Sequence, residues 1–275
     1  MQRRSKLTTT LLYVFGIIYG LAILGPIAWI LLLALKNALD AFAYPPLFIF
    51  EPTLEHFIAI FEDPEFRLAF SNSVIIATGS VALAMLFAIP ATFAITIMRG
   101  RARRNSLLTI LLIRMVPGMI YLLPYFVFYS RIDLLDTHIG LIVIYLIFCL
   151  PLIIWTLVPV WGAVPLELRE SGMIDGASLW QILFLIELPL VRIGIIASGI
   201  VAFIFAWNEF LFALVITRKK VVTLPVVITR YMGYEGYEWG KISAAAVVIM
   251  LPVVVFGFLI QRYMITGLTA GAVKG

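Results

Sequence analysis

Long runs of apolar residues alternate with shorter polar segments along the whole chain. Each run has about 20 residues or more, which is the length that an α-helix needs to cross a hydrocarbon core of about 30 Å. Hydrocarbon offers no partner for backbone N–H and C=O groups, so such runs form helices. We therefore predict an all-α integral membrane protein with six transmembrane helices, at Leu11–Leu35, Val74–Ile97, Leu107–Tyr129, Ile139–Trp161, Ile193–Ile216 and Ile242–Ile260.

The composition supports this class of protein. Hydrophobic residues make up 63% of the 275 residues and charged residues only 13%, which excludes an ordinary soluble domain. The first apolar run is too long for a removed leader and lacks a small-residue cleavage site, so we interpret it as a retained membrane helix. We expect one transmembrane domain over residues 1–275, with its core spans at about residues 70–262.

The distribution of Lys and Arg predicts the orientation. Six spans place both termini on one side, and the basic stretch "RGRARR" at residues 99–104 lies in a short loop on that same side. Because cytoplasmic loops carry the excess of Lys and Arg, we expect both termini in the cytoplasm, although "TRKK" at residues 217–220 opposes this orientation. The net positive charge then indicates contact with anionic lipid and not with nucleic acid.

Residues that carry other chemistry are few. Cys149 stands alone within the fourth span, so the sequence predicts neither a disulfide framework nor a thiolate metal cluster. His56 and His138 lie in separate outer segments, and the chain contains no hydrolase or metalloprotease signature. We therefore expect no metal site and no catalytic centre.

The stretch "ELRESGMIDGASLWQILFLIELPL" at residues 167–190 interrupts the apolar pattern with four carboxylates. Its pattern predicts two short helices joined by a hinge. Gly176 can adopt the left-handed turn that ends the first helix, and Ser178 with Gln181 forms a capping box for the second. Pro189 is expected to close the second helix before the fifth span.

The first of these helices presents a stripe of mostly small residues, formed by Leu168, Ser171, Gly172 and Asp175. Small side chains let another surface come close. The helix could lie on lipid as an amphipathic interfacial helix, or it could contact a protein. Acids avoid anionic headgroups and basic residues are scarce here, so the pattern favours a protein partner.

The same stretch resembles the EAA loop of ABC-transporter permease subunits, whose pattern is roughly E-A-A-x-x-D-G-A followed by an aromatic residue and Leu-Pro. Ser171 and Gly172 replace the two alanines, which preserves their small size. The positions that match in spacing are Glu170, Asp175, Gly176, Ala177 and Pro189.

Further strings extend the resemblance over nearly the whole chain. "DLLDT" at residues 133–137, "VPLEL" at 164–168, "WNEFLFALVIT" at 207–217 and the final "GLTAGAVKG" are similar to the maltose-type carbohydrate permeases. The resemblance implies the type I ABC importer permease fold. It also implies partners: a second permease subunit, preferably a different chain, two ATP-binding cassette ATPase subunits, and an external substrate-binding protein.

Residues 162–190, called the EAA segment below, would dock on the ATPase if the resemblance holds. Glu170 would then supply a charged contact, Gly176 a hinge and Ala177 a close approach. The residues implied in coupling to the ATPase are Glu167, Glu170, Ser171, Gly172, Asp175, Gly176 and Ala177.

The chain itself lacks a nucleotide motif. The nearest approach to a phosphate loop ends at Gly240-Lys241, one residue short in spacing, with Ile242 where Ser or Thr is needed. We therefore expect no cofactor and no catalysis in this chain, with ATP and Mg bound by the partner subunits.

A polar trio lies within the fifth predicted span. Trp207 offers a flat apolar face and Asn208 and Glu209 offer hydrogen-bonding groups, the combination that a neutral sugar needs. We hypothesise that the trio lines the substrate pathway or the seam with the partner permease; a hydrogen-bond clasp between helices is the alternative. Tyr121 and Tyr125, on one face of the third span, could stack on sugar or simply pack.

These observations predict the permease subunit of an ATP-driven importer that moves a di- or oligosaccharide, or a related polyol, across the inner membrane of a bacterial or archaeal cell. The alternatives are a permease for glycerol phosphate or another small polar solute and, with less support, an ion-coupled secondary transporter. Ion-coupled carriers usually show internal repeats, and the two halves of this chain share no convincing repeat.

Overall fold

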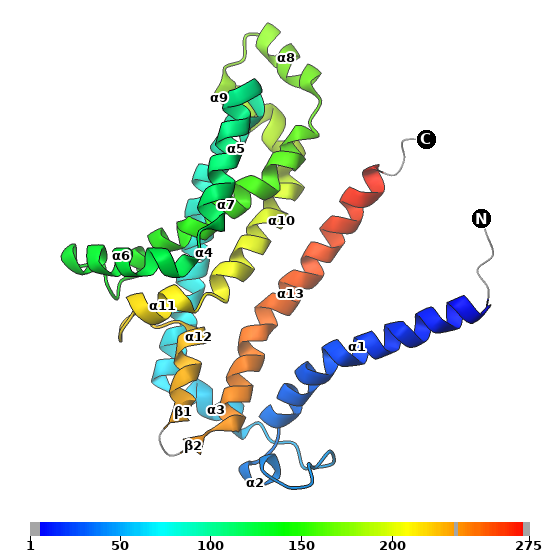
Figure 1. Cartoon of the computed structure of the whole chain (residues 1–275), viewed down its shortest axis with the longest axis vertical. Helices are drawn as coiled ribbons and strands as arrows, with labels where there is room; N and C mark the ends of the chain where they lie inside the picture. Colours follow the sequence, from blue (N-terminus) through cyan, green and yellow to red (C-terminus); the bar gives the residue numbers. More distant parts are fainter. Residues whose placement is uncertain (1–5, 234–235, 272–275) are drawn as a thin grey trace. The chain divides into compact units, whose positions relative to one another are not determined.

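The computed structural model describes residues 6–233 and 236–271, and nearly all of its elements are helices (Figure 1). The chain forms two compact units. Unit 1 contains residues 1–67 and 228–250, and unit 2 contains residues 68–227 and 251–275. The single transmembrane domain stays a prediction, and each unit is described by itself.

Long apolar helices dominate the described chain. Five are long and apolar enough to cross a membrane, and a bent pair of helices supplies a sixth span. The predicted all-α membrane class is therefore confirmed. The five helices are α1 (Lys6–Ala34), α4 (Pro64–Ile97), α7 (His138–Gly162), the continuous helix Leu179–Trp207 and α13 (Trp239–Gly271).

The third span is broken, so the prediction of one continuous helix at Leu107–Tyr129 is wrong. It consists of α5 (Gly100–Met115) and α6 (Gly118–Arg131), which meet at 82°. Val116 and Pro117 are both extended there, with ψ of 124° and 132°. Proline has no N–H to donate and disfavours a helical residue before it, so the helix ends at this point.

The fifth span begins earlier than predicted. A helix runs without a break from α9 (Leu179–Gln181) through the π-helical segment η1 (Ile182–Glu187) into α10 (Leu188–Trp207). Pro189 therefore does not close a helix; it lies in the first turn of α10. The N–H of Leu188 donates to the Leu183 carbonyl five residues earlier. This wider turn admits the proline ring, which has no N–H of its own.

The fifth span also ends earlier than predicted. Asn208 caps α10, and the chain breaks before the short helix α11 (Leu211–Ile216). α12 (Leu224–Val227) follows after an irregular stretch. The predicted span Ile193–Ile216 therefore contains most of one transmembrane helix and one separate short helix.

α7 is the central helix of unit 2. Half of its apolar window is buried, compared with 6% for α1, and it packs extensively against α10 and α5. Near its C-terminal end, Trp161 joins a buried apolar cluster with Phe93 of α4, Val191 of α10 and two residues of η1, Ile182 and Leu183. This cluster fixes the place where the chain enters the EAA segment.

Unit 1 contains α1, α2 (Ala38–Ala41), α3 (Glu55–Glu62), the 3-10 helix η2 (Ile228–Tyr231) and the antiparallel pair β1 (Met232–Gly233) and β2 (Gly236–Tyr237). α3 is a short amphipathic helix with Ile60 buried. The Tyr231 hydroxyl donates to Asp63 over 2.9 Å, and Arg230 pairs with Glu65. Burial and the nearby Asp63 carboxylate raise the pKa of Tyr231, so its hydroxyl remains a donor. These contacts attach η2 to the start of α4.

In unit 2, a single carboxylate organises the turn after α11. Asp136 lies in the loop before α7 with φ of +56°, and its two oxygens accept five backbone hydrogen bonds of 3.0 to 3.2 Å. The donors are the N–H groups of Arg218, Lys219, Lys220 and Val221. Partial burial would raise the pKa of the Asp136 carboxyl, but these N–H groups outweigh burial, and the pKa lies below its usual value.

Two side chains of α4, Asn72 and Ser73, also form hydrogen bonds to this turn. Asn72 is buried and donates to the carbonyls of Lys220 and Val222 over 3.0 Å each, while its own oxygen lies 2.8 Å from His138 Nε2. The neighbouring Ser73 hydroxyl accepts from the Leu224 N–H over 2.8 Å. Residues 218–224 are thus fixed between α4 and the start of α7.

We expect Asp136→Asn to lower the free energy of unfolding by about 2 kcal/mol at pH 7, because an amide NH2 group replaces one charged acceptor. The folded-state pKa is lowered, so the contribution is complete above the unfolded-state value of about 3.9 and is lost as the pH falls through the folded-state value. Thermal unfolding in detergent at stepwise lower pH would measure this, with wild type and variant converging in acid.

Asp133→Asn is the matched control for this variant, because Asp133 has a similar φ of +54° and accepts none of these bonds. We expect its free energy of unfolding to stay within about 0.5 kcal/mol of wild type. Equal losses in the two variants would contradict the assigned role of Asp136.

Candidate functional site

The EAA segment begins with a short helix that ends in a well-defined turn. α8 (Leu166–Ile174) is followed by Asp175 as its C-cap and by Gly176 with φ of +80°. The N–H of Gly176 donates to the Met173 carbonyl over 3.1 Å, and the N–H of Ala177 donates to Gly172 over 2.9 Å. These two bonds form a Schellman motif, which needs a left-handed residue at Gly176. The predicted helix end is confirmed.

The second predicted helix start is also confirmed. Ser178 accepts from the Gln181 N–H, and the Gln181 side chain accepts from the Ser178 N–H over 2.7 Å, which completes a capping box. The turn between α8 and α9 is therefore closed by hydrogen bonds on both sides and needs no external partner to form.

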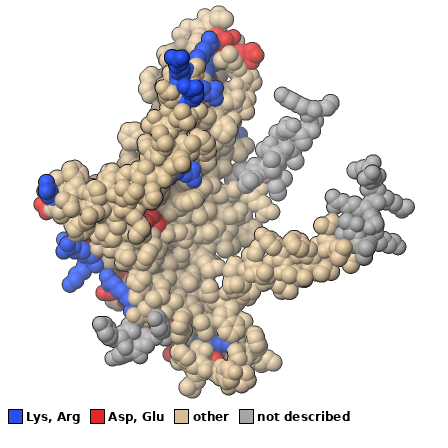
Figure 2. Space-filling view, viewed as in Figure 1, with Lys and Arg blue, Asp and Glu red and all other residues tan. Residues whose placement is uncertain are grey.

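The exposed surface of α8 combines carboxylates with apolar side chains. Five of the residues implied in coupling are exposed on or beside this helix, as is Ile174, whose side chain is 86% exposed. Figure 2 shows acidic side chains gathered over α8, with basic side chains nearby at the same end of unit 2. The five exposed residues are Glu167, Glu170, Ser171, Asp175 and Gly176.

Gly172 and Ala177 face the chain itself, which corrects the expectation that Gly172 belongs to a partner-facing strip. A Cβ atom on the buried Gly172 would lie 2.8 Å from Ile186 Cδ1 and 3.4 Å from Ile182 Cγ1. Ala177 packs against the apolar cluster around Trp161. The small residues of the EAA segment thus permit close packing of α8 on η1 within this chain.

A buried ion pair joins the same two elements. Arg169 of α8 is 8% exposed and Glu187 of η1 is fully buried. The Arg169 Nε donates to Glu187 Oε1 over 2.5 Å, and its Nη2 donates to Oε2 over 2.9 Å. A bidentate pair of this kind fixes both the distance and the orientation of the two side chains.

Neighbours from two further helices complete the environment of the pair. The Trp161 indole N–H of α7 donates to Glu187 Oε2 over 2.6 Å. Arg169 also reaches the Thr96 hydroxyl of α4 over 3.4 Å, and its guanidinium lies 5.3 Å from the centre of the Phe93 ring. Four elements of unit 2 therefore meet at one carboxylate.

Sequence reasoning missed this network. Glu187 gives a usable signal, because a carboxylate inside the apolar run "ILFLIELPL" requires a partner. The sequence nevertheless offers two candidate cations, Arg169 and Arg192, and Arg192 is closer along the chain. Only the packing of α8 on η1 buries Arg169 and leaves Arg192 exposed.

The polar trio at the end of the fifth span does not converge on one surface. Trp207 is only 2% exposed, stacks on Phe203 with 5.7 Å between ring centres and meets the edge of Phe70. Asn208 is exposed, and its side chain donates to the Ile204 carbonyl over 2.8 Å. Trp207 is therefore a core residue of unit 2, and only the other two members of the trio reach an open surface.

Glu209 caps the N-terminus of α11. Its carboxylate accepts from the N–H groups of Phe212 and Ala213 over 2.9 and 3.1 Å. A carboxylate at a helix N-terminus satisfies N–H groups that have no partner within the helix. This capping role of Glu209 is local, and both the pathway hypothesis and the interhelical clasp stay predictions.

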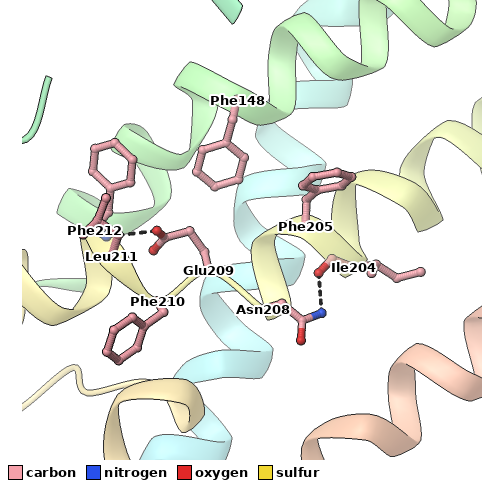
Figure 3. Close-up of a pocket in the computed structure, with 8 residues that line it drawn as sticks. All are labelled: Phe148, Ile204, Phe205, Asn208, Glu209, Phe210, Leu211 and Phe212. Carbon is pink, nitrogen blue, oxygen red and sulfur yellow. Dashed lines mark hydrogen bonds between the residues drawn. The ribbon is translucent and has the colours of Figure 1, made fainter. Parts of the chain in front are cut away.

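Asn208 and Glu209 also line a mostly apolar cavity of about 500 Å³. Figure 3 shows Glu209 turned toward α11 and Asn208 turned back toward Ile204, with phenylalanine rings around them. The cavity presents phenylalanine rings beside the side-chain amide of Asn208. Its lining residues are Phe148, Ile204, Phe205, Asn208, Glu209, Phe210, Leu211 and Phe212.

Tyr121 and Tyr125 lie on α6, beyond the bend of the third span. The Tyr121 hydroxyl donates to the Ile113 carbonyl of α5 over 3.4 Å, and Tyr125 packs edge-on against Tyr129. Neither residue lines the cavity next to Asn208. Within the described residues, no group of His, Cys, Asp and Glu side chains could hold a metal ion.

The long apolar helices and the exposed EAA segment are the features of a multi-pass transport permease. A sequence model of the family described as "Binding-protein-dependent transport system inner membrane component" matches residues 80–269. The chain belongs to this family, and the predicted resemblance to importer permeases is confirmed.

Individual relatives match nearly the whole chain. It is 34% identical to the trehalose transport system permease protein SugB of Mycobacterium tuberculosis, over 94% of this chain and 95% of that protein. It is 31% identical to the trehalose/maltose transport system permease protein MalG of Thermococcus litoralis, over 99% of each chain.

A solved structure has the same fold. The chain matches a subunit in the crystal structure of a bacterial ABC transporter involved in the import of the acidic polysaccharide alginate. The TM-score is 0.82 at 20% sequence identity, and the match covers 96% of this chain and 99% of that one. The predicted importer permease fold is therefore confirmed.

The capping role of Glu209 can be separated from a transport role by two variants. We expect Glu209→Ala to lower the free energy of unfolding by about 1 kcal/mol, because two N–H groups of α11 lose their acceptor. Asn208→Ala should stay within about 0.5 kcal/mol of wild type, since its side chain bonds only to a carbonyl of its own helix. Thermal unfolding in detergent measures both.

Sugar uptake by Asn208→Ala and by Glu209→Gln then tests the pathway. Reduced uptake in the stable Asn208→Ala variant would assign Asn208 to the substrate pathway. Normal uptake in both Asn208→Ala and Glu209→Gln would contradict the pathway hypothesis.

Proposed function

We propose that this chain is a permease subunit of an ATP-driven carbohydrate importer. The observation that carries the proposal is its similarity, over at least 94% of its length, to permease proteins named for trehalose and maltose transport. A di- or oligosaccharide is the substrate class that these relatives favour. The apolar cavity beside Asn208 suits a neutral sugar, since its phenylalanine rings and single amide edge resemble the surfaces on which sugars stack and bond.

The partner ATPase is proposed to dock on α8. The exposed side chains there include the carboxylates of Glu167 and Glu170 beside apolar residues such as Ile174, and the helix is short, which suits insertion into a groove with basic and apolar residues. Glu170 and Asp175 would make charged contacts in this groove. ATP and Mg would be bound by the partner, and the transport subunit itself would catalyse no reaction.

The remaining partners and the orientation follow from the same proposal. A second permease, preferably a different chain, would complete the pathway, and an external binding protein would deliver the sugar. The EAA segment must then face the cytoplasm with both termini, the orientation that the basic stretch at residues 99–104 favours. Closure of the ATPase pair would move α8 and switch the pathway between its two sides.

Reconstituted transport tests the proposal. The chain would be co-purified with the ATPase, permease partner and binding protein encoded beside it and placed in proteoliposomes with labelled trehalose, maltose, glycerol phosphate or amino acids. We expect uptake of a di- or oligosaccharide that requires ATP and stops when the ATPase is omitted. Uptake by the chain alone, driven by an ion gradient, would instead identify a secondary transporter.

We expect Gly176→Val to uncouple transport while the chain remains in the membrane. Valine disfavours the left-handed conformation that the turn after α8 requires, so the turn changes shape and α8 no longer fits the ATPase. ATP-dependent uptake should fall by about tenfold or more, and immunoblots of membranes should show normal amounts of the chain.

Gly100→Val is the matched control for Gly176→Val. Gly100 has φ of +59° and open space around its Cα, as Gly176 does, but it lies outside the EAA segment. Its uptake should stay close to wild type. Unimpaired uptake in Gly176→Val, or equal losses in both variants, would count against coupling through this turn.

A further inference from the structure

We propose that the Arg169–Glu187 ion pair is the rigid joint that makes α8 move together with the helix Leu179–Trp207, so that both residues position the coupling machinery. The proposal rests on the proposed function, because it assumes that an ATPase moves α8. It adds a mechanical contact between side chains to the turn at Gly176.

The backbone links alone would leave α8 free to rotate. α8 is joined to α7 through residues 163–165 and to α9 through residues 175–178, and two short links permit rotation about the line that joins them. Two lateral contacts remove this freedom: the bidentate Arg169–Glu187 pair and the close packing of Gly172 on Ile186. Because these contacts lie at different points along α8, they fix its direction as well as its distance.

The π-helical segment explains how η1 reaches both points. Residues five apart lie nearer to one face in a π-helix, whose turns are wider, than in an α-helix, where they are about 140° apart. Ile182 and Glu187 are five apart, and both face α8: Ile182 lies near Gly172, and Glu187 binds Arg169. A regular α-helix over the same residues would turn one of the two contacts away.

The joint also connects α8 to helices on either side. Glu187 Oε2 accepts from Trp161 of α7, and Arg169 reaches Thr96 of α4. A displacement of α8 is therefore transmitted to three membrane helices through one ion pair, and the direction of each hydrogen bond is fixed by the geometry of the guanidinium and the indole.

Stability alone does not account for a buried ion pair at this place. Replacing such a pair by apolar side chains of similar volume is often neutral or stabilising, because neither charge must then be desolvated. This difference makes an apolar replacement the sharpest test: it keeps the packing of α8 on η1 but removes the fixed direction.

The test uses the complete transporter in proteoliposomes and measures sugar uptake and ATP hydrolysis on the same sample. We expect the double variant Arg169→Met with Glu187→Leu to assemble and hydrolyse ATP, but to move about tenfold less sugar per ATP than wild type. Double variant Thr156→Val with Ser198→Ala is the matched control. It removes a 2.9 Å hydrogen bond between α7 and α10, and its sugar-to-ATP ratio should equal that of wild type.

Two single variants keep the test decisive if the double variant does not assemble. Arg169→Lys retains the charge but not the bidentate geometry, and Trp161→Phe removes one donor to Glu187 while keeping an aromatic ring. Each should lower the sugar-to-ATP ratio by about threefold to tenfold. Wild-type ratios in whichever of these three variants assemble would overturn the joint. Failure of the wild-type complex to take up sugar would instead overturn the proposed function.

Discussion

The absence of hydrogen-bond partners in hydrocarbon governs every irregular feature of this molecule. A helix can be interrupted at membrane depth only where the freed N–H and C=O groups find local partners. After the break at Asn208, the Glu209 carboxylate supplies partners for the first N–H groups of α11. After α8, the Schellman bonds at Gly176 and the capping box at Ser178 do the same. These two interruptions thus have their own acceptors, built from residues beside them.

Charge inside unit 2 follows the same rule. Glu187 is fully buried, and the groups around it are donors: a guanidinium and an indole N–H. Asp136 lies in a loop outside the spans, and backbone N–H groups surround it in the same way. In both places a carboxylate organises segments that are distant in sequence. Apolar packing could hold these segments together, but it would not determine their relative directions as closely.

The features that sequence could predict are those that depend on neighbouring residues. Apolar runs located the membrane helices, and the left-handed turn at Gly176 and the capping box at Ser178 follow from residues within a single turn. Proline was a poorer guide. Pro90 and Pro252 lie inside continuous helices, whereas Pro117 ends one. Of these three prolines, Pro117 is the one followed by glycine. A Pro-Gly pair is a turn signal, so the sequence could have revealed this break.

Features that depend on packing between elements could not be predicted in this way. Gly172 was read as part of an outward stripe because helical periodicity gives the residues on a face, but not the direction in which that face points. For the same reason, the sequence could not decide whether Arg169 or Arg192 is the partner of Glu187. Trp207 was expected beside a sugar, yet Phe203 and Phe70 enclose it. The sequence correctly identified the three residues at the end of the span, but it could not predict which surfaces their side chains face.

The π-helical segment has a consequence for how this chain can change in length. A π turn contains one residue more than an α-helical turn of the same backbone, so deletion of a single residue between Ile182 and Glu187 restores regular geometry. Local helical stability would improve, and the side chains on either side of the deletion would keep their relative orientation, because the wide turn holds the extra residue. A one-residue deletion in a regular part of the helix would instead rotate every side chain before it by about 100° relative to those after it. This turn can therefore lose a residue without changing which side chains share a face of the helix.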